Sequence, residues 1–269
     1  MPLRLPAPPV PPTPGPAAGP GPVVLFLPAH DEEATVASVV GRVPELVLGR
    51  RVECLVVDDG SSDRTAELAA GAGAVVLGSG ANRGLGAAVR TGLAAAVRRG
   101  AAAVAFCDAD GEYDPRELDR LVAPILEGRA DYVVGSRFAG EIRRMLPHRR
   151  AGNRLLTRLL GWMARAPISD GQSGYRALSW TAADAEVVHD YNYAQVLTLD
   201  LLAKGYRYLE VPIGYRWRTA GRSFVRPAAY LRWVVPAVWR ELNAAPARAE
   251  PAAVGPYLHD RRADAPGVR

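Results

Sequence analysis

The stretch Cys107-Asp108-Ala109-Asp110-Gly111-Glu112-Tyr113, here called the acidic turn, begins where an apolar run over residues 101–106 ends. Alternate residues of a strand point to the same side, so a strand ending here would aim Asp108 and Asp110 in one direction. Two carboxylates placed in this way can hold one hard divalent cation that bridges a diphosphate. An isolated pair is also typical of a solvated turn after a strand, so the interpretation depends on the rest of the chain.

The composition is that of a globular protein with a basic bias. The 269 residues are 49% hydrophobic and 23% charged, which is enough to bury the core of one large domain. The net charge is +5, and Lys204 is the only lysine. Arginine favours bidentate contact with phosphate, although genomic base composition explains the same bias. The two cysteines, Cys54 and Cys107, lie in apolar runs and are interpreted as reduced core thiols without a function.

Apolar strands alternate with alanine-rich helical stretches from residue 23 onwards. The expected strands cover residues 23–27, 52–57, 74–77, 104–107 and 132–134. Strands and helices in alternation predict an α/β fold, in which a mostly parallel sheet carries helices on both faces. Ligands of such sheets bind beyond the carboxyl ends of the strands. The acidic turn falls at one of these ends.

Two further polar clusters follow the first and second expected strands. Pro28-Ala29-His30-Asp31-Glu32-Glu33 precedes a helix with valines on one face, and Asp58-Asp59-Gly60-Ser61-Ser62-Asp63 precedes the next helix. Asp and Ser cap helices and Asp-Gly makes turns, so Ser62 or Asp63 is expected to be a helix cap. Three acidic clusters at successive strand ends nevertheless predict a nucleotide cleft, because carboxylates accept hydrogen bonds from base N–H groups and ribose hydroxyls.

Six motifs occur in order between residues 23 and 223. They are Pro28-Ala29-His30-Asp31-Glu32-Glu33, Val57-Asp58-Asp59-Gly60-Ser61-Ser62-Asp63, Asn82-Arg83-Gly84-Leu85-Gly86, Asp108-Ala109-Asp110-Gly111, Gly135-Ser136-Arg137-Phe138 and Asp170-Gly171-Gln172-Ser173-Gly174-Tyr175-Arg176. Together they resemble the inverting glycosyltransferases of family 2, which have the GT-A fold, and specifically the dolichol-phosphate mannose and glucose synthase-like branch. The chain departs from the family pattern at His30 and Asp31, which replace an aromatic residue and an asparagine, and at Gln195, where many relatives have a carboxylate.

The resemblance implies an enzyme that binds a nucleotide diphosphate sugar, linked through GDP or UDP, with Mg²⁺ or Mn²⁺ as cofactor. Asp108 and Asp110 would hold the metal. The nucleotide sugar would contact Pro28, His30, Glu32, Asp58, Asp59, Asn82, Gly84, Asp108, Ala109 and Asp110. An acceptor phosphate would meet Ser136, Arg137, Ser173, Arg176, Arg218, Arg222 and Ser223. The predicted catalytic residues are Asp108, Asp110, Asp170, Arg137 and Arg176.

The acceptor decides whether a base is required. A hydroxyl acceptor must lose a proton as it attacks, whereas a phosphomonoester is already an anionic nucleophile at pH 7. It needs cationic guides, and the chain offers Arg137, Arg176 and a basic run over residues 216–223, for which a solvated loop is the alternative interpretation. Asp170 remains the one candidate base; its other expected role is to orient Arg176 or the acceptor loop. We therefore predict a polyprenyl phosphate as the acceptor.

Two segments combine apolar with basic residues. Residues 153–165 have the pattern of an amphipathic helix, and residues 224–242 mix aromatic and aliphatic residues with arginine. Core packing explains either segment alone equally well. Together, in a chain without a signal peptide or about 18 consecutive apolar residues, they predict a cytoplasmic protein that contacts the inner face of the cell membrane peripherally.

The expected organisation has four parts. They are a disordered Pro-rich leader at residues 1–22, a GT-A glycosyltransferase domain at 23–223, an amphipathic helical segment at 224–243 and a disordered tail at 244–269.

Four other functions remain as alternatives. A soluble family 2 enzyme that glycosylates a hydroxyl of a small metabolite or natural product would use Asp170 as its base. A catalytically lapsed nucleotide- and metal-binding protein is suggested only by Gln195, His30 and Asp31. A dinucleotide-binding oxidoreductase is suggested by Gly84-Leu85-Gly86, but the third glycine is absent and the motif follows the third strand. Nucleic-acid binding rests on charge alone, and the interspersed acids argue against it.

Overall fold

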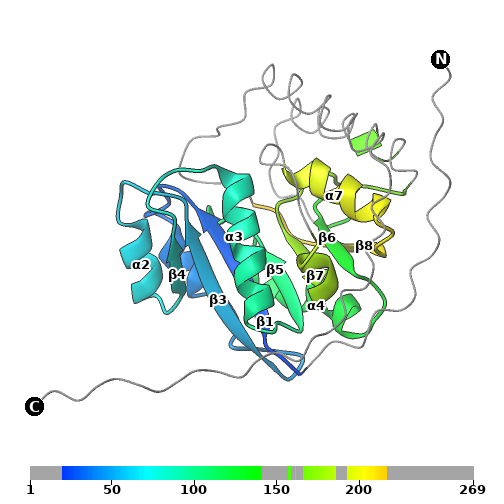
Figure 1. Ribbon diagram of the computed structural model, residues 1–269, viewed down its shortest axis with the longest axis horizontal. Coiled ribbons are helices and arrows are strands. Elements are labelled where there is room, and N and C mark those ends of the chain that lie inside the picture. Colours follow the sequence, from blue (N-terminus) through cyan, green and yellow to red (C-terminus); the bar gives the residue numbers. More distant parts are fainter. Residues whose placement is uncertain (1–19, 141–156, 159–160, 162–165, 186–192, 217–269) are drawn as a thin grey trace, which may run out of the picture.

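The fold is an α/β sandwich built on one eight-stranded sheet (Figure 1). The computed structural model describes residues 20–140, 157–158, 161, 166–185 and 193–216. The strands are β1 (Val23–Ala29), β2 (Leu46–Val47), β3 (Arg50–Asp58), β4 (Val75–Gly78), β5 (Ala103–Phe106), β6 (Tyr132–Ser136), β7 (Arg176–Ser179) and β8 (Tyr208–Pro212). The helices are α1 (Val36–Val40), α2 (Thr65–Gly71), α3 (Leu85–Arg98), η1 (Pro115–Glu117), α4 (Leu118–Leu126), α6 (Trp180–Ala183) and α7 (Tyr193–Ala203).

The sheet is mostly parallel, as the sequence predicts. Its strand order is β2-β3-β1-β5-β7-β6-β8, and β4 pairs with β3. β1 pairs in parallel with β3 and β5, β3 with β4, and β6 with β8. All five expected strands are present. Three strands are missing from the prediction: the two-residue β2, the edge strand β8, and β7, which lies antiparallel to both β5 and β6.

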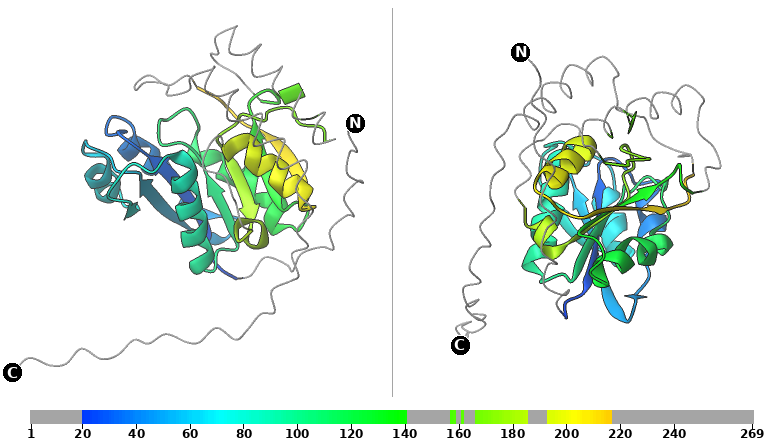
Figure 2. Two further views of the ribbon diagram at one scale, coloured as in Figure 1. Left: turned by 45° about the horizontal axis from the view of Figure 1, so that its top comes forward. Right: turned by 90° about the vertical axis from the view of Figure 1, so that its right-hand side faces the viewer.

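Helices cover both faces of the sheet (Figures 1 and 2). Alternate residues of β1 explain this, because Leu25 and Leu27 pack towards α1, α2 and α4, whereas Val24 and Phe26 pack towards α3, α6 and α7. Phe26 stacks on Phe106 of β5 with ring centroids 5.0 Å apart. Strands that are buried on both faces in this way have a continuous run of hydrophobic residues in their sequence.

The close contact between α3 and β1 depends on a glycine. A Cβ atom added at Gly92 would lie 2.3 Å from the ring of Phe26, so a larger residue would force the helix and the sheet apart. Close packing here holds the middle of α3 against β1, one of the strands whose carboxyl ends carry the polar motifs.

Several predicted segments fall outside the described residues. These are most of residues 153–165, the whole of residues 224–242, residues 1–19 of the expected leader and the expected tail. Within the part of the chain that the structure describes, no helix combines the length and apolarity needed to cross a bilayer.

Candidate active site

The loops after β1 and β3 are joined by hydrogen bonds at the carboxyl edge of the sheet. The backbone N–H of Asp31 donates to Ser61 Oγ at 3.0 Å, and the N–H of Ser62 donates to Asp31 Oδ1 at 2.8 Å. Asp31 has a φ of 53°, in the left-handed region that aspartate and asparagine tolerate better than most residues. Asp31 thus keeps a structural function that the family's asparagine can also perform.

Asp63 binds the backbone at the start of α2 and also holds the first loop. Its Oδ1 accepts the backbone N–H of Thr65 at 2.9 Å, and its Oδ2 accepts the N–H of Glu33 at 3.1 Å. Burial opposes ionisation of Asp63, but the Thr65 hydroxyl and these N–H groups outweigh it and hold the pKa of Asp63 below its ordinary value. Arg64, not Ser62 or Asp63, stands at the N-cap position of α2 and makes no side-chain cap bond, so the expected cap is replaced by the hydrogen bond that Asp63 accepts from the first helical residue.

Removal of the Asp63 carboxylate should therefore destabilise the protein in a pH-dependent way. We expect Asp63→Ala to lower the free energy of unfolding by about 1 kcal/mol at pH 7, because its hydrogen bonds are lost. Because the folded pKa lies below the ordinary value, this contribution is present above the ordinary pKa and is lost as the pH falls through the folded pKa. Urea unfolding of both proteins from pH 7 down to about pH 2 measures it. A difference that stays constant with pH would contradict the assignment.

Asp59 ties the loop after β4 to the loop after β3. Its side chain is 5% exposed, and its two oxygens accept the backbone N–H groups of Arg83 at 2.8 Å and Gly84 at 2.7 Å. Gly60 explains the tight approach, since a Cβ there would lie 2.5 Å from the backbone of Ala81 and its φ is 71°. Asp59 positions the start of α3, a function that the sequence did not reveal.

His30 and Asn82 meet across two loops, as expected for residues predicted to bind the same ligand. The Asn82 amide nitrogen lies 3.1 Å from His30 Nε2, while the buried His30 Nδ1 has no hydrogen-bond partner among the described residues. Asp58, also predicted here, accepts the N–H of Ser61 at 3.1 Å. The structure thus gathers polar groups from the loops after β1, β3 and β4 at one edge of the sheet. Pro28 and Ala109 are buried and shape the surrounding backbone.

The acidic turn follows β5 at this same edge. Asp110 is 7% exposed, and its Oδ1 accepts the N–H of Glu112 at 3.0 Å, which fixes the turn. A Cβ at Gly174 would lie 2.5 Å from Asp108 Oδ2, so the backbone of the 170–175 loop lies directly against Asp108. The N–H of Gly174 donates to the Tyr113 hydroxyl at 2.8 Å. Two motifs far apart in the sequence therefore meet at Asp108.

The donor set of the acidic turn fits a hard divalent cation. Asp108 and Asp110 are separated by one residue just after the end of a strand, so the acidic turn offers two carboxylates. Among the described residues no group of three or more His, Cys, Asp or Glu side chains could hold a metal without further ligands. Mg²⁺ and Mn²⁺ are commonly bound by one or two carboxylates, with waters and substrate phosphates as the other ligands. Burial raises the pKa of Cys107 well above its ordinary value, and Asp108 and Asp110 raise it further, so this thiol stays neutral.

Arg137 and Asp170 form a buried ion pair. Arg137 Nε lies 2.7 Å from Asp170 Oδ2 and Nη2 lies 2.8 Å from Oδ1, while the backbone N–H groups of Arg137 and Gln172 also donate to this carboxylate. Asp170 is fully buried and Arg137 is 6% exposed. The carboxylate therefore orients Arg137, which is not the partner that the sequence suggested. Next to this pair, the buried Ser136 Oγ lies 2.6 Å from Ser169 Oγ.

Arg176 differs most from the prediction. It is 0% exposed, and its guanidinium donates to the carbonyl oxygens of Ser173 at 2.8 Å and Ala194 at 2.6 Å, to Thr198 Oγ1 at 3.0 Å and to the Tyr132 hydroxyl. It joins the 170–175 loop to α7 inside the core. The predicted contact of Arg176 with an acceptor phosphate is therefore wrong in this structure, because the group is enclosed by protein acceptors.

The other predicted acceptor contacts divide into two groups. Ser173 is fully buried, and its Oγ accepts the N–H of Tyr175 at 3.3 Å, so it shapes the loop. Arg218, Arg222 and Ser223 lie outside the described residues.

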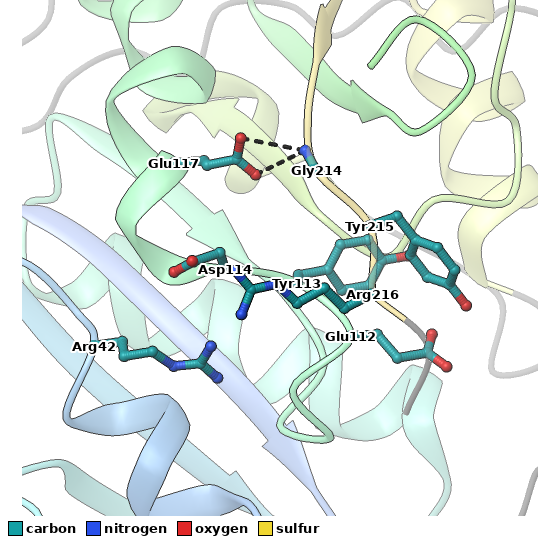
Figure 3. Close-up of a pocket in the computed structure, with 8 residues that line it drawn as sticks. All are labelled: Arg42, Glu112, Tyr113, Asp114, Glu117, Gly214, Tyr215 and Arg216. Atoms are coloured by element: carbon teal, nitrogen blue, oxygen red, sulfur yellow. Dashed lines mark hydrogen bonds between the residues drawn. The ribbon is translucent and has the colours of Figure 1, made fainter. Parts of the chain in front are cut away.

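Two tyrosines near the acidic turn were missed by the sequence analysis. The ring of Tyr113 lies 6.0 Å from those of Tyr175 and Tyr215, and the Arg137 guanidinium lies 5.2 Å from the centroid of the Tyr215 ring. Figure 3 shows Tyr113 next to Tyr215. These contacts join the acidic turn, the 170–175 loop and the segment after β8. The only signal in the sequence is that Tyr113 ends the acidic turn; nothing local marks Tyr215.

Known proteins similar to this chain agree with the geometry. The family described as "Glycosyl transferase family 2" matches residues 24–183. A dolichyl-phosphate hexose transferase of Haloferax volcanii is 31% identical over 214 residues, which cover 77% of this chain and 88% of that protein. A polyprenol monophosphomannose synthase of Mycolicibacterium smegmatis is 32% identical over 220 residues, which cover 74% of this chain and 79% of that protein.

A solved structure confirms the fold. The crystal structure of glucosyl-3-phosphoglycerate synthase from Mycobacterium tuberculosis with Mn²⁺, UDP and glucosyl-3-phosphoglycerate matches with a TM-score of 0.67 at 25% identity, over 82% of this chain and 80% of that chain. The mixed sheet with a mostly parallel core is common to both. The chain therefore belongs to glycosyltransferase family 2, has the GT-A fold and is a hexosyltransferase similar to the dolichyl-phosphate and polyprenol-phosphate enzymes.

Proposed function

We propose that the protein transfers a hexosyl unit, with inversion, from a GDP- or UDP-linked sugar to a polyprenyl phosphate at the inner face of the cell membrane. The observation that carries the proposal is the contact between Asp108 and Gly174, because it brings the acidic turn and the loop beside Arg137 to one place. The transfer needs an acidic site that holds the metal and the donor diphosphate, and next to it a basic site for the anionic acceptor.

The nucleotide sugar would lie over the loops after β1, β3 and β4. His30 and Asn82 supply polar groups there, and Asp58 supplies carboxylate oxygens to the base or ribose. Asp108 and Asp110 would hold Mg²⁺ or Mn²⁺, and the bound cation would neutralise the leaving diphosphate. The related synthase of Mycobacterium tuberculosis was solved with Mn²⁺ and UDP and also with Mg²⁺ and UDP, which supports both ions.

An anionic acceptor is proposed because the 170–175 loop offers no free base. Both oxygens of Asp170 accept donors from Arg137, so a role as general base would require this buried ion pair to break. A phosphate acceptor needs no base. We propose that Arg137 and Ser136 lie beside its path, together with Arg218, Arg222 and Ser223, and that residues 153–165 and 224–242 meet the lipid. The names of the two polyprenyl-type relatives support this acceptor class.

A second candidate is transfer to a small soluble acceptor. Its support is the solved synthase, whose complexes contain phosphoglyceric acid and glucosyl-3-phosphoglycerate. The fold of that enzyme covers most of this chain, so the same scaffold is compatible with an acceptor that is not a lipid.

A donor panel separates the two candidates. The full chain is incubated with radiolabelled GDP- and UDP-sugars, Mn²⁺ or Mg²⁺, and either a polyprenyl phosphate or phosphoglyceric acid. We expect label to enter the organic phase only with the polyprenyl phosphate and one nucleotide class, and the product to have the inverted anomeric configuration. The same incubation with a dephosphorylated polyprenol is the control. Label found only in the aqueous product with phosphoglyceric acid would replace the lipid proposal with the soluble one.

A further inference from the structure

A cavity of about 180 Å³ is lined in part by the end of the acidic turn (Figure 3). None of its lining residues comes from the loops after β1, β3 and β4 that form the nucleotide side. The cavity is bounded by the residues after β5, by the segment after β8 and by Arg42, which follows α1. The space is about six times the volume that one water occupies in the liquid. It can therefore hold a small polar group with several hydrogen-bond partners.

Two guanidinium groups, those of Arg42 and Arg216, line this cavity and point towards one another (Figure 3). Arg42 Nε donates to the carbonyl oxygen of Ser38 at 3.1 Å, which fixes the direction of that side chain. Neither guanidinium forms an ion pair within the described ranges of the chain. Like charges that face one another repel, so an anion placed between the two groups would stabilise them.

The carboxylates around the cavity already have donors of their own. Asp114 is paired with Arg116 at 2.7 Å. Glu117 accepts the N–H of Gly214 at 2.9 Å and pairs with Arg120, also at 2.9 Å. Arg116 and Arg120 therefore offset most of the negative charge of these two carboxylates, although Arg42 also helps to lower the pKa of Asp114. Arg216 forms no ion pair with either carboxylate among the described residues.

A bound cation is the competing interpretation, since Glu112, Asp114 and Glu117 all line the cavity. The geometry argues against it, because within the described residues no three acidic, cysteine or histidine side chains converge well enough to hold a metal ion. Two guanidinium forks favour an oxyanion, and phosphate matches their planar donor geometry with several oxygens.

We propose that this cavity binds a phosphate group between Arg42 and Arg216, at a site separate from the nucleotide cleft. Such a ligand would join three parts of the fold. A Cβ at Gly111 of the acidic turn would lie 3.8 Å from Arg42 Nη2, and the backbone N–H of Arg216 donates to the carbonyl oxygen of Glu112 at 3.0 Å. A phosphate held by both arginines therefore fixes the acidic turn from outside the nucleotide cleft. The proposal is independent of which acceptor the enzyme uses.

The test measures phosphate binding without activity. The full chain, freed of metal with EDTA, is titrated with inorganic phosphate by calorimetry at low ionic strength. We expect one saturable site whose affinity falls at least tenfold in Arg42→Ala and in Arg216→Ala. Arg98→Ala, which removes an exposed arginine at the end of α3, is the matched control and should bind as the wild type does. Absence of saturable binding, or equal affinity in all three variants, would overturn the proposal.

Folding and the source of the phosphate are controlled separately. The melting temperature of each variant is measured, and Arg42→Gln and Arg216→Gln replace any alanine variant that melts early. The same set is then titrated with glycerol 1-phosphate and sedimented with phosphatidylcholine vesicles that contain phosphatidic acid. Arginine-dependent binding of glycerol 1-phosphate identifies a free phosphomonoester, and arginine-dependent binding to the vesicles alone identifies a lipid headgroup. Binding that depends on neither arginine in any arm contradicts the site.

Discussion

Asp110→Asn should lower the transferase rate by on the order of 100-fold or more, while the protein stays folded. The substitution keeps the size of the side chain and an oxygen for the N–H of Glu112, which Asp110 accepts at 3.0 Å. It removes the negative charge with which the acidic turn would hold a divalent cation. EDTA should abolish the activity of the wild type, and an excess of Mn²⁺ or Mg²⁺ should restore it.

The control for this prediction is Asp119→Asn, which removes an exposed carboxylate from the first turn of α4 in the same part of the chain. It should keep full activity. Mn²⁺ binding, followed by electron paramagnetic resonance, provides a readout besides activity: Asp110→Asn should weaken it and Asp119→Asn should not. If the Asp110→Asn enzyme binds Mn²⁺ normally and turns over at the wild-type rate, the prediction of a metal site at the acidic turn is wrong.

The parallel part of the fold could be predicted because it is encoded locally. β1 and β5 are apolar runs that are buried along their whole length, and β3 becomes apolar and buried in its second half. Each of the three strands leads directly into a polar motif. β7 was missed because its four residues show no clear alternation and follow a motif that dominates the local pattern. Its antiparallel place between β5 and β6 depends on how the chain returns to the sheet, which no short stretch of sequence specifies.

The site was predictable as a set of loops and much less as a set of side-chain roles. Parallel strands bring their carboxyl ends together, so the meeting of His30 with Asn82 follows from the fold. Whether a polar side chain faces a ligand or another part of the protein depends on partners distant in sequence. Asp170 pairs with Arg137, 33 residues earlier, and Arg176 reaches the carbonyl oxygen of Ala194, 18 residues later.

Replacement of Arg176 provides the second large effect that we expect, and the effect is on stability. Arg176→Ala should lower the free energy of unfolding by on the order of 3 to 5 kcal/mol, because it leaves a cavity and removes the donors of several buried oxygens. Those oxygens include the carbonyls of Ser173 and Ala194 and the hydroxyl of Thr198. Urea unfolding followed by circular dichroism measures the change.

Arg176→Met separates loss of packing from loss of hydrogen bonds, since methionine fills most of the same space without donors. It should recover part of the stability but not all of it, and the exposed control Arg98→Met should unfold as the wild type does. An arginine that guided an acceptor phosphate would behave differently: its loss would raise the acceptor KM, leave the donor KM unchanged and leave the urea midpoint in place. That result would show that Arg176 contacts the acceptor after all. Loss of stability in both variants, with both KM values affected in the protein that remains folded, would confirm that Arg176 joins the 170–175 loop to α7 and does not guide the acceptor.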